Sequence, residues 1–267
     1  MAAARIESFR RERGARGGVL LLHGFTGSPY EMECLADPLA EAGWSVVGVR
    51  FPGHGSPEET EDNTWPAWRA TAEEALADVE AIANGGPTFV VGLSMGALIA
   101  LELAARHPER LRGIVALSPA ITLPSPLPAL LGLAHYLPSR WRGFALPKGP
   151  SDIRDLEARA RHPVSNPFPF SAILSFDELR RRAVSVAPSV RQPLLIVHAR
   201  RDRTCPLEGA SWLSRNVASE RVEMHVLERS GHVIPVDCEG AEAVRLILGF
   251  LEGEAGPASV DRDSGPR

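Results

Sequence analysis

Short, continuously apolar segments alternate with amphipathic segments along most of this chain. The first three apolar segments are residues 19–23, 44–50 and 88–93. Continuous apolar runs of this length are typical of strands buried on both faces, as in parallel sheets that helices cover. The segment 29–42 between two of them repeats its apolar residues at steps of three and four, which predicts a helix. The alternation therefore predicts an α/β fold with a doubly wound, mostly parallel sheet.

The alternation continues late in the chain but is interrupted in the middle. Further strands are predicted at residues 111–118, 193–199 and 221–227, and a last helix ends near Leu251. Between residues 119 and 189 the pattern stops, and 11 of the 23 prolines of the chain lie there. A compact domain rarely contains a structureless loop of about 70 residues. We therefore expect this segment to form an inserted cap of short helices above the strand ends.

The interruption predicts how the chain is divided. Residues 17–118 and 190–252 are expected to form the core, and residues 119–189 the cap. The terminal segments 1–16 and 253–267 are rich in small, polar or charged residues, so we expect both to be flexible.

Composition excludes several classes of protein. A content of 44% hydrophobic and 23% charged residues is typical of a globular domain, and a net charge of −4 argues against nucleic acid as a partner. Three cysteines without a CxxC pair exclude a disulfide framework and a zinc ribbon, and no motif for a metal or a cofactor occurs. Because no apolar run is long enough for a membrane span or a signal peptide, we expect a cytoplasmic protein.

The strongest local motif is Gly-Leu-Ser-Met-Gly at residues 92–96, where a predicted strand meets a predicted helix. A serine on such a strained turn raises its hydroxyl above the sheet, and the helix that follows directs N–H groups at developing negative charge. The flanking glycines leave room for close backbone packing. Ser94 is therefore the candidate nucleophile, although a tight turn with a capping serine remains an alternative.

A nucleophilic serine needs a general base, and the base needs an orienting acid. In this architecture the acid and then the histidine follow the serine along the chain, each after a late strand. Asp202 follows the strand 193–199, and His232 follows the strand 221–227. We predict that these residues complete a triad with Ser94. Asp237 is an alternative acid, but it lies on the other side of the histidine in the chain.

Acyl transfer also requires donors for the tetrahedral oxyanion. The backbone N–H groups of Met95 and of Phe25, in the loop after the first predicted strand, are the candidates. His23 is expected to stabilise that loop. The leucine-rich parts of the cap are expected to bind an acyl chain through apolar burial. The residues predicted to contact substrate are His23, Leu123, Leu127, Leu130 and Val233.

Several motifs together resemble the bacterial carboxylesterase and monoacylglycerol lipase family of the α/β-hydrolase superfamily. The similarity covers roughly residues 17–251 and is looser in the cap, where GPSDIR at 149–154 differs from the family's Gly-Ser-Asp-Ile/Leu-Lys stretch. The resemblance implies that Ser94, Asp202 and His232 form the triad. The segments that carry it are LLLHGFTGSP at 20–29, PGHG at 52–55, GLSMG at 92–96, ARRD at 199–202 and SGHVIPVD at 230–237.

The resemblance implies a serine carboxylic-ester hydrolase that acts through an acyl-enzyme and needs no cofactor. Its expected substrates are monoacylglycerols or similar short-to-medium acyl esters. Lysophospholipase and acyl thioesterase activity remain alternatives, as does a non-catalytic ligand-binding protein on the same fold. The expected partner is a small ester with an apolar acyl chain, and a transient contact between the cap and a lipid surface is a further expectation. The oligomeric state stays open.

Overall fold

A computed structural model describes residues 7–13, 16–54, 63–136, 138, 144–147, 149–163 and 167–256. The outer parts of the two predicted flexible segments, residues 1–6 and 257–267, lie outside the described residues.

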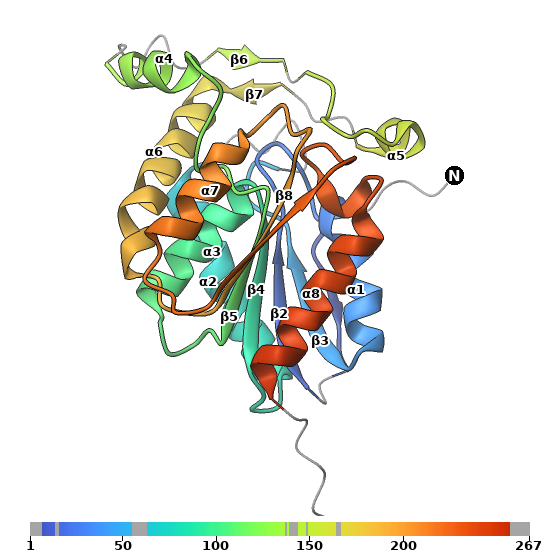
Figure 1. Ribbon diagram of the computed structural model, residues 1–267. Helices are drawn as coiled ribbons and strands as arrows, with labels where there is room; N and C mark the ends of the chain where they lie inside the picture. Colours follow the sequence, from blue (N-terminus) through green and yellow to red (C-terminus); the bar gives the residue numbers. More distant parts are fainter. Residues whose placement is uncertain are drawn as a thin grey trace, which may run out of the picture.

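A seven-stranded sheet forms the centre of the molecule, with the strand order β1-β3-β2-β4-β5-β8-β9 (Figure 1). β1 pairs antiparallel with β3, whereas the other six strands run parallel to one another. Helices cover both faces, so the inner strands are buried along their whole length, as the continuous apolar runs predicted. The strands are β1 (Phe9–Arg11), β2 (Gly17–Leu22), β3 (Trp44–Val49), β4 (Thr88–Leu93), β5 (Gly113–Leu117), β8 (Leu194–Ala199) and β9 (Val222–Leu227).

Each face of the sheet has its own layer of helices and its own apolar core. α1 (Tyr30–Glu41) and α8 (Gly240–Ala255) cover one face (Figure 1). The predicted doubly wound α/β fold is therefore confirmed. The other face is covered by α2 (Trp65–Ile82), α3 (Met95–Arg106) and α7 (Leu207–Asn216), and α6 (Phe170–Val186) packs on α3 and α2.

The structure contains elements that the sequence pattern did not predict. β1 lies inside a segment expected to be flexible and contains a single apolar residue, Phe9. The ring of Phe9 packs against Gly48 of β3, where any side chain would overlap it. A strand with a single apolar residue has no apolar periodicity that a sequence pattern could reveal. α7 was also not predicted, and α8 continues to Ala255, past the expected core boundary at residue 252.

The segment 119–189, for which we expect an inserted cap, has two parts. The first holds α4 (Leu127–Ala134), β6 (Ala145–Leu146), α5 (Leu156–Arg161) and β7 (Phe168–Pro169), which lie above the carboxyl ends of the strands (Figure 1). The second part is α6, which differs from the short helices expected: it is 17 residues long and runs down the flank of the core. α6 packs on α3, and Arg182 reaches Glu102 of α3 at 3.1 Å. The described residues also form short 3-10 helices at Ala187–Ser189 and Ile234–Val236.

The strand order places the loops that follow β2 and β4 beside a crevice. From β2 the chain moves outward to β3, and it later returns to β4 on the opposite side of β2. Loops that leave neighbouring strands in opposite directions open a crevice at the carboxyl edge of the sheet, where ligands of such folds bind. The loop at residues 24–29 follows β2, and Ser94 follows β4. The topology thus brings the predicted nucleophile and the predicted oxyanion loop together.

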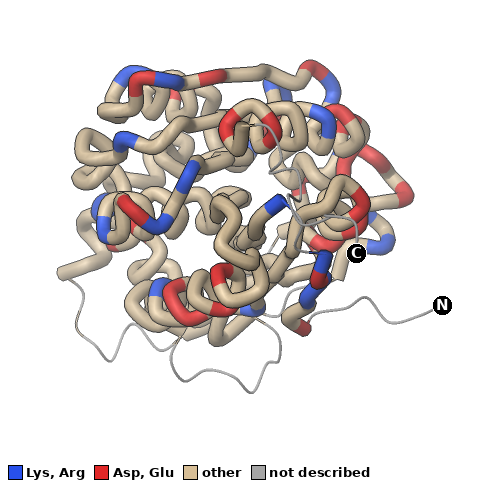
Figure 2. The backbone as a smooth tube through the Cα atoms, turned by 90° about the horizontal axis from the view of Figure 1, so that it is seen from below, with Lys and Arg blue, Asp and Glu red and all other residues tan. Residues whose placement is uncertain are grey.

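Charged residues do not gather on one side of the described chain. Figure 2 shows acidic and basic residues interspersed along the peripheral helices and loops. No helix among the described residues combines the length and the apolar character needed to cross a bilayer.

Candidate active site

Ser94 occupies a strained turn between β4 and α3. Its φ angle is 55°, in a region that non-glycine residues rarely adopt. Its N–H donates to the carbonyl of Leu117 on β5 at 2.9 Å, which fixes the turn to the sheet. A side chain at position 96 would overlap the carbonyl of Leu22 on β2, and one at position 92 would overlap the backbone of Gly96. Both glycines of the motif are therefore needed for close backbone packing.

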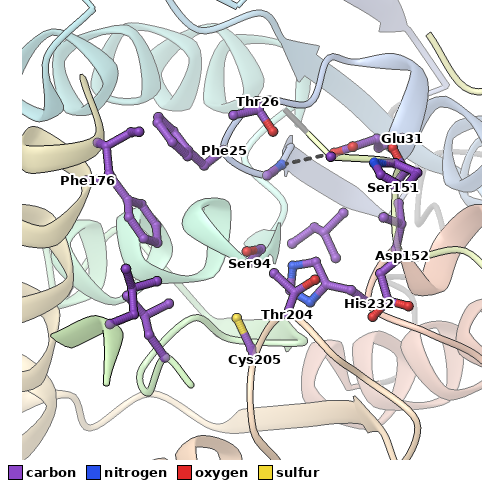
Figure 3. Close-up of a pocket in the computed structure, with 18 of the residues that line it drawn as sticks. Phe25, Thr26, Glu31, Ser94, Ser151, Asp152, Phe176, Thr204, Cys205 and His232 are labelled. Carbon is purple, nitrogen blue, oxygen red and sulfur yellow. Dashed lines mark hydrogen bonds between the residues drawn. The ribbon is translucent and has the colours of Figure 1, made fainter. Parts of the chain in front are cut away.

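His232 and Asp202 form a buried hydrogen-bonded pair. Nδ1 of His232 lies 2.7 Å from Oδ2 of Asp202, whose side chain is only 1% exposed. The other carboxylate oxygen accepts the N–H groups of Thr204 and Cys205, each at 2.8 Å. Because an ionised carboxylate only accepts hydrogen bonds, the proton of a neutral imidazole lies on Nδ1 and Nε2 is the basic atom. Figure 3 shows the His232 ring beside Ser94, and both residues line the same pocket.

The charge of Asp202 is stabilised by its surroundings. Burial by itself raises the pKa of this carboxyl, but attraction to His232, the hydrogen bond with its ring and the N–H of Cys205 outweigh burial. The net pKa of Asp202 lies below its ordinary value. The carboxylate therefore stays ionised at neutral pH, where it can orient the imidazole and stabilise its cationic form.

Asp237, the alternative acid, has a different set of partners. Its carboxylate accepts the backbone N–H groups of Gly231 at 2.6 Å, Asp155 at 2.8 Å and Arg154 at 2.9 Å. Burial raises the pKa of Asp237, but these donors and the N–H of Cys238 outweigh it and hold the pKa below the ordinary value. Asp237 thus ties the loop that carries the histidine to the cap, and Asp202 is the partner of the imidazole.

The loop after β2 is held by its own backbone and by aromatic packing. Thr26 has a φ angle of 62°, and the N–H of Gly27 donates to the carbonyl of Gly24 at 3.1 Å. The ring of Phe25 stacks on that of Phe176 from α6, with centroids 5.0 Å apart. Among the described residues, none accepts the N–H of Phe25. The N–H of Met95 belongs to the first residue of α3, which has no acceptor inside its helix. Both groups suit the predicted role as oxyanion donors.

A pocket of about 370 Å³ opens at Ser94 and His232 between the core and the cap. One wall is apolar and comes mainly from the cap, with the predicted contacts Leu123 and Leu127 among its residues. Val233, also predicted, lines the pocket beside the histidine. The apolar wall consists of Leu123, Leu127, Leu131, Ile173 and Phe176, and the polar side chains of the opposite wall are Thr26, Glu31, Ser151 and Asp152.

Two predicted substrate contacts do not line the pocket. His23 is fully buried beneath the loop, where Nδ1 donates to the carbonyl of Gly24 at 2.8 Å and Nε2 accepts the N–H of Phe51 at 3.2 Å. It therefore stabilises the loop, as the sequence suggested, but does not face substrate. Leu130 is 56% exposed on the outer side of α4, whereas Leu131 points inward. A helical step of four from Leu127 would have selected Leu131 instead.

Several pocket residues were not anticipated from the sequence. Ile173 and Phe176 come from α6, whose position on the flank of the core could not be inferred from the chain order. Cys205 is buried, consistent with a small apolar residue, and burial raises the pKa of its thiol.

Within the part of the chain that is described, no group of three acidic, histidine or cysteine residues is arranged to hold a metal ion.

Comparison with known proteins agrees with this geometry. Residues 13–239 match the Hydrolase_4 family, which is described as serine aminopeptidase S33. A thermostable monoacylglycerol lipase from Bacillus sp. (strain H-257) is 30% identical over 94% of this chain and 96% of that protein. A carboxylesterase from Bacillus subtilis is 24% identical over 90% of this chain and 94% of that protein.

Solved structures give the same result. A structure from work on LipS and LipT, two metagenome-derived lipolytic enzymes, is 31% identical, covers 92% of this chain and 97% of its own, and superimposes with a TM-score of 0.81. The match with the family model spans most of the chain. The chain therefore belongs to the Hydrolase_4 family of α/β-hydrolases and is a serine hydrolase of the lipase and carboxylesterase type.

Proposed function

We propose that this protein hydrolyses monoacylglycerols or similar short-to-medium acyl esters through an acyl-enzyme. The observation that carries the proposal is the 2.7 Å pair of His232 and Asp202 beside Ser94, at the mouth of a pocket with one apolar and one polar wall. The names of the relatives support the same reaction, since they include a monoacylglycerol lipase and a carboxylesterase.

The reaction follows from the roles of these groups. His232 takes the proton of the Ser94 hydroxyl through Nε2 while the oxygen attacks the ester carbonyl, and Asp202 stabilises the imidazolium that forms. The N–H groups of Phe25 and Met95 bind the oxyanion. The C–O bond to the alcohol then breaks, and the imidazolium returns its proton to the leaving alcohol. Water attacks the acyl-enzyme in the same way and releases the acid and free Ser94.

The two walls of the pocket suggest which side of the ester each receives. The apolar wall suits an acyl chain, because each buried methylene contributes about 0.8 kcal/mol. The polar wall carries the carboxylates of Glu31 and Asp152, and among the described lining residues there is no lysine or arginine. Arg154 lies 3.9 Å from Asp152 and offsets part of that charge. An acidic wall favours a neutral alcohol such as glycerol over a leaving group that carries phosphate.

The substrate class can be tested by comparing initial rates on esters that share one acyl chain. We expect a 1-monoacylglycerol to be hydrolysed at least about tenfold faster, in kcat/KM, than a lysophosphatidic acid, because the phosphate is repelled by the acidic wall. Ethyl esters and thioesters of the same chain separate general esterase and thioesterase activity. Equal or faster hydrolysis of the phosphate-bearing substrate would contradict the assignment of a neutral substrate.

We also propose that residues 119–189 act as a cap whose exposed apolar side chains dock transiently on a lipid surface. All large hydrophobic side chains that are highly exposed in the described chain lie between residues 127 and 156. Leu133 of α4 is 69% exposed and Leu130 is 56% exposed. Exposed apolar side chains that lie together on one element, as on α4, mark interaction surfaces. The set consists of Leu127, Leu130, Leu133, Tyr136, Phe144, Leu146 and Leu156.

Charged substitutions on α4 should separate lipid binding from catalysis. In Leu130→Glu/Leu133→Glu we expect binding to phosphatidylcholine vesicles to fall roughly tenfold or more, because two apolar side chains no longer insert. Hydrolysis of dissolved p-nitrophenyl butyrate should not change. Ser185→Glu/Ser189→Glu adds the same charges at exposed positions at the carboxyl end of the segment 119–189, away from α4, and serves as the control. Equal loss in both variants would contradict docking through α4.

We also propose a cytoplasmic location for the protein. Its three cysteines, Cys34, Cys205 and Cys238, are all free thiols. Free thiols persist in reducing compartments, whereas oxidising compartments favour disulfides.

A further inference from the structure

A buried glutamate lies beneath the loop that carries one predicted oxyanion donor. Glu31 stands in the first turn of α1 and is 3% exposed. Its Oε2 accepts the N–H of Gly24, the residue before Phe25, at 3.2 Å. A side chain at Gly27 would overlap the same carboxylate, so the loop from Gly24 to Gly27 curves closely around Glu31. The carboxylate thus supports the loop that presents the N–H of Phe25.

The other oxygen of Glu31 connects this loop to the cap. Oε1 lies 3.1 Å from Nε2 of His162, at the end of α5, and His162 is itself buried. Nδ1 of His162 lies 3.1 Å from the hydroxyl of Ser151, also in the cap. Figure 3 shows Glu31 and Ser151 on the same wall of the pocket, where the dashed line marks the bond from the Gly24 N–H.

The chemistry of these groups makes the contact directional. A carboxylate can only accept, so Nε2 of His162 donates to Glu31, and a neutral ring then accepts the Ser151 hydroxyl proton at Nδ1. A carboxylate removed from water is strongly destabilised unless donors surround it, so the position of Glu31 depends on both the loop and the cap. The place of Glu31 in the first turn of α1 also stabilises its negative charge, because the helix dipole is positive at the N-terminus.

Resting on the proposed ester hydrolysis, we propose that Glu31 and His162 form a core–cap bridge that positions the oxyanion loop. Glu31 is then a positioning residue: it touches neither the nucleophile nor the scissile bond, but holds the backbone from which the N–H of Phe25 points. The same carboxylate is shared by the loop and by His162, so the contact between cap and core and the position of the oxyanion loop depend on one group.

The bridge is tested by the kinetic step that its loss affects. In Glu31→Ala we expect kcat on p-nitrophenyl butyrate to fall about tenfold to hundredfold with KM changed less than about threefold, because a displaced donor weakens only the transition state. The affinity of a trifluoromethyl ketone, which forms an oxyanion on the serine, should fall by a similar factor. Glu31→Gln retains an acceptor for the Gly24 N–H and should recover most of the rate.

The partner and a matched control complete the experiment. His162→Ala should lower kcat in the same direction, and the double variant should be no worse than Glu31→Ala, because both substitutions break one unit. Glu33→Ala changes the same helical turn at a partly exposed site and should leave kcat unchanged. If Glu31→Ala does not fold, the kcat and inhibitor affinity of His162→Ala test the bridge instead.

Two outcomes would overturn the bridge. One is a folded Glu31→Ala with the parental kcat and inhibitor affinity, and the other is a loss confined to KM. Stoichiometry of fluorophosphonate labelling separates this inference from the function itself. Bridge variants should still label one serine per chain, only more slowly, whereas failure of the proposed ester hydrolysis would appear in the parental protein itself, as absent turnover of p-nitrophenyl butyrate.

Discussion

Replacing Ser94 by alanine should lower kcat for ester hydrolysis by at least about 10⁴-fold while the fold is retained. The substitution removes the only atom that forms the acyl bond, and the oxyanion donors alone supply little of the rate. The side chain of Ser94 makes no contact that the sheet depends on, because the turn is fixed by its N–H to Leu117 and by the flanking glycines. Turnover of p-nitrophenyl butyrate and the thermal midpoint measure the two effects.

A matched control for this loss is Ser185→Ala. Ser185 lies exposed on α6, where its hydroxyl donates to the carbonyl of Arg182 at 2.7 Å. We expect parental activity and covalent labelling by a fluorophosphonate in this variant, and no labelling in Ser94→Ala. Parental turnover by Ser94→Ala would show that another residue is the nucleophile.

Asp202→Asn should lower kcat about 10³- to 10⁴-fold, the second largest effect. The amide can donate to Nδ1 of His232, which moves the imidazole proton to Nε2, so the atom that must take the Ser94 proton is already occupied. Because the pKa of Asp202 lies below its ordinary value, its carboxylate stays ionised between pH 5 and 8. Loss of parental activity on acidification across that range therefore does not report protonation of Asp202. Steady-state rates from pH 5 to 8 give both results.

Asp237→Asn separates the two acids, because its main effect should be on stability. Asp237 accepts four backbone N–H groups, and an amide in its place sets a donor against some of them. We expect the free energy of unfolding to fall by about 3 kcal/mol, which lowers the thermal midpoint by roughly 6–12 °C, while kcat stays within tenfold of the parental value. The folded pKa is depressed, so the stabilisation is present above the ordinary carboxyl pKa and is lost as pH falls through the folded value. A kcat loss as large as that of Asp202→Asn would contradict this division.

Much of the fold could be predicted from local patterns in the sequence. The elements that could not be predicted have identifiable physical reasons. The runs that became β2, β4 and β8 are buried on both faces, so nearly every residue along them is apolar or glycine, with Thr88 and His198 as the exceptions. β1 escaped because it pairs at the edge of the sheet and is anchored by one ring against Gly48. The flank position of α6 escaped because chain order does not show which helix packs beside α3.

The candidate reacting residues could be proposed from the sequence for the same reason that the strands could be predicted. A serine between two glycines at a strand end, an acid after a later strand and a histidine after the last are fixed by connectivity, since parallel strands end at one edge. The sequence could not choose between Asp202 and Asp237 by contact. The structure decides it, because only the distance of 2.7 Å to Oδ2 of Asp202 identifies the partner of the ring.

By itself, the sequence determined the doubly wound sheet and the chemistry, because both depend on periodicity and on order along the chain. Only the tertiary structure decided which side chains surround the substrate. It turned Leu130 outward and Leu131 inward, buried His23 beneath the oxyanion loop and joined Glu31 to His162 across 131 positions of sequence. Those contacts depend on how the cap packs on the core, and packing between distant segments leaves no local pattern in a single chain.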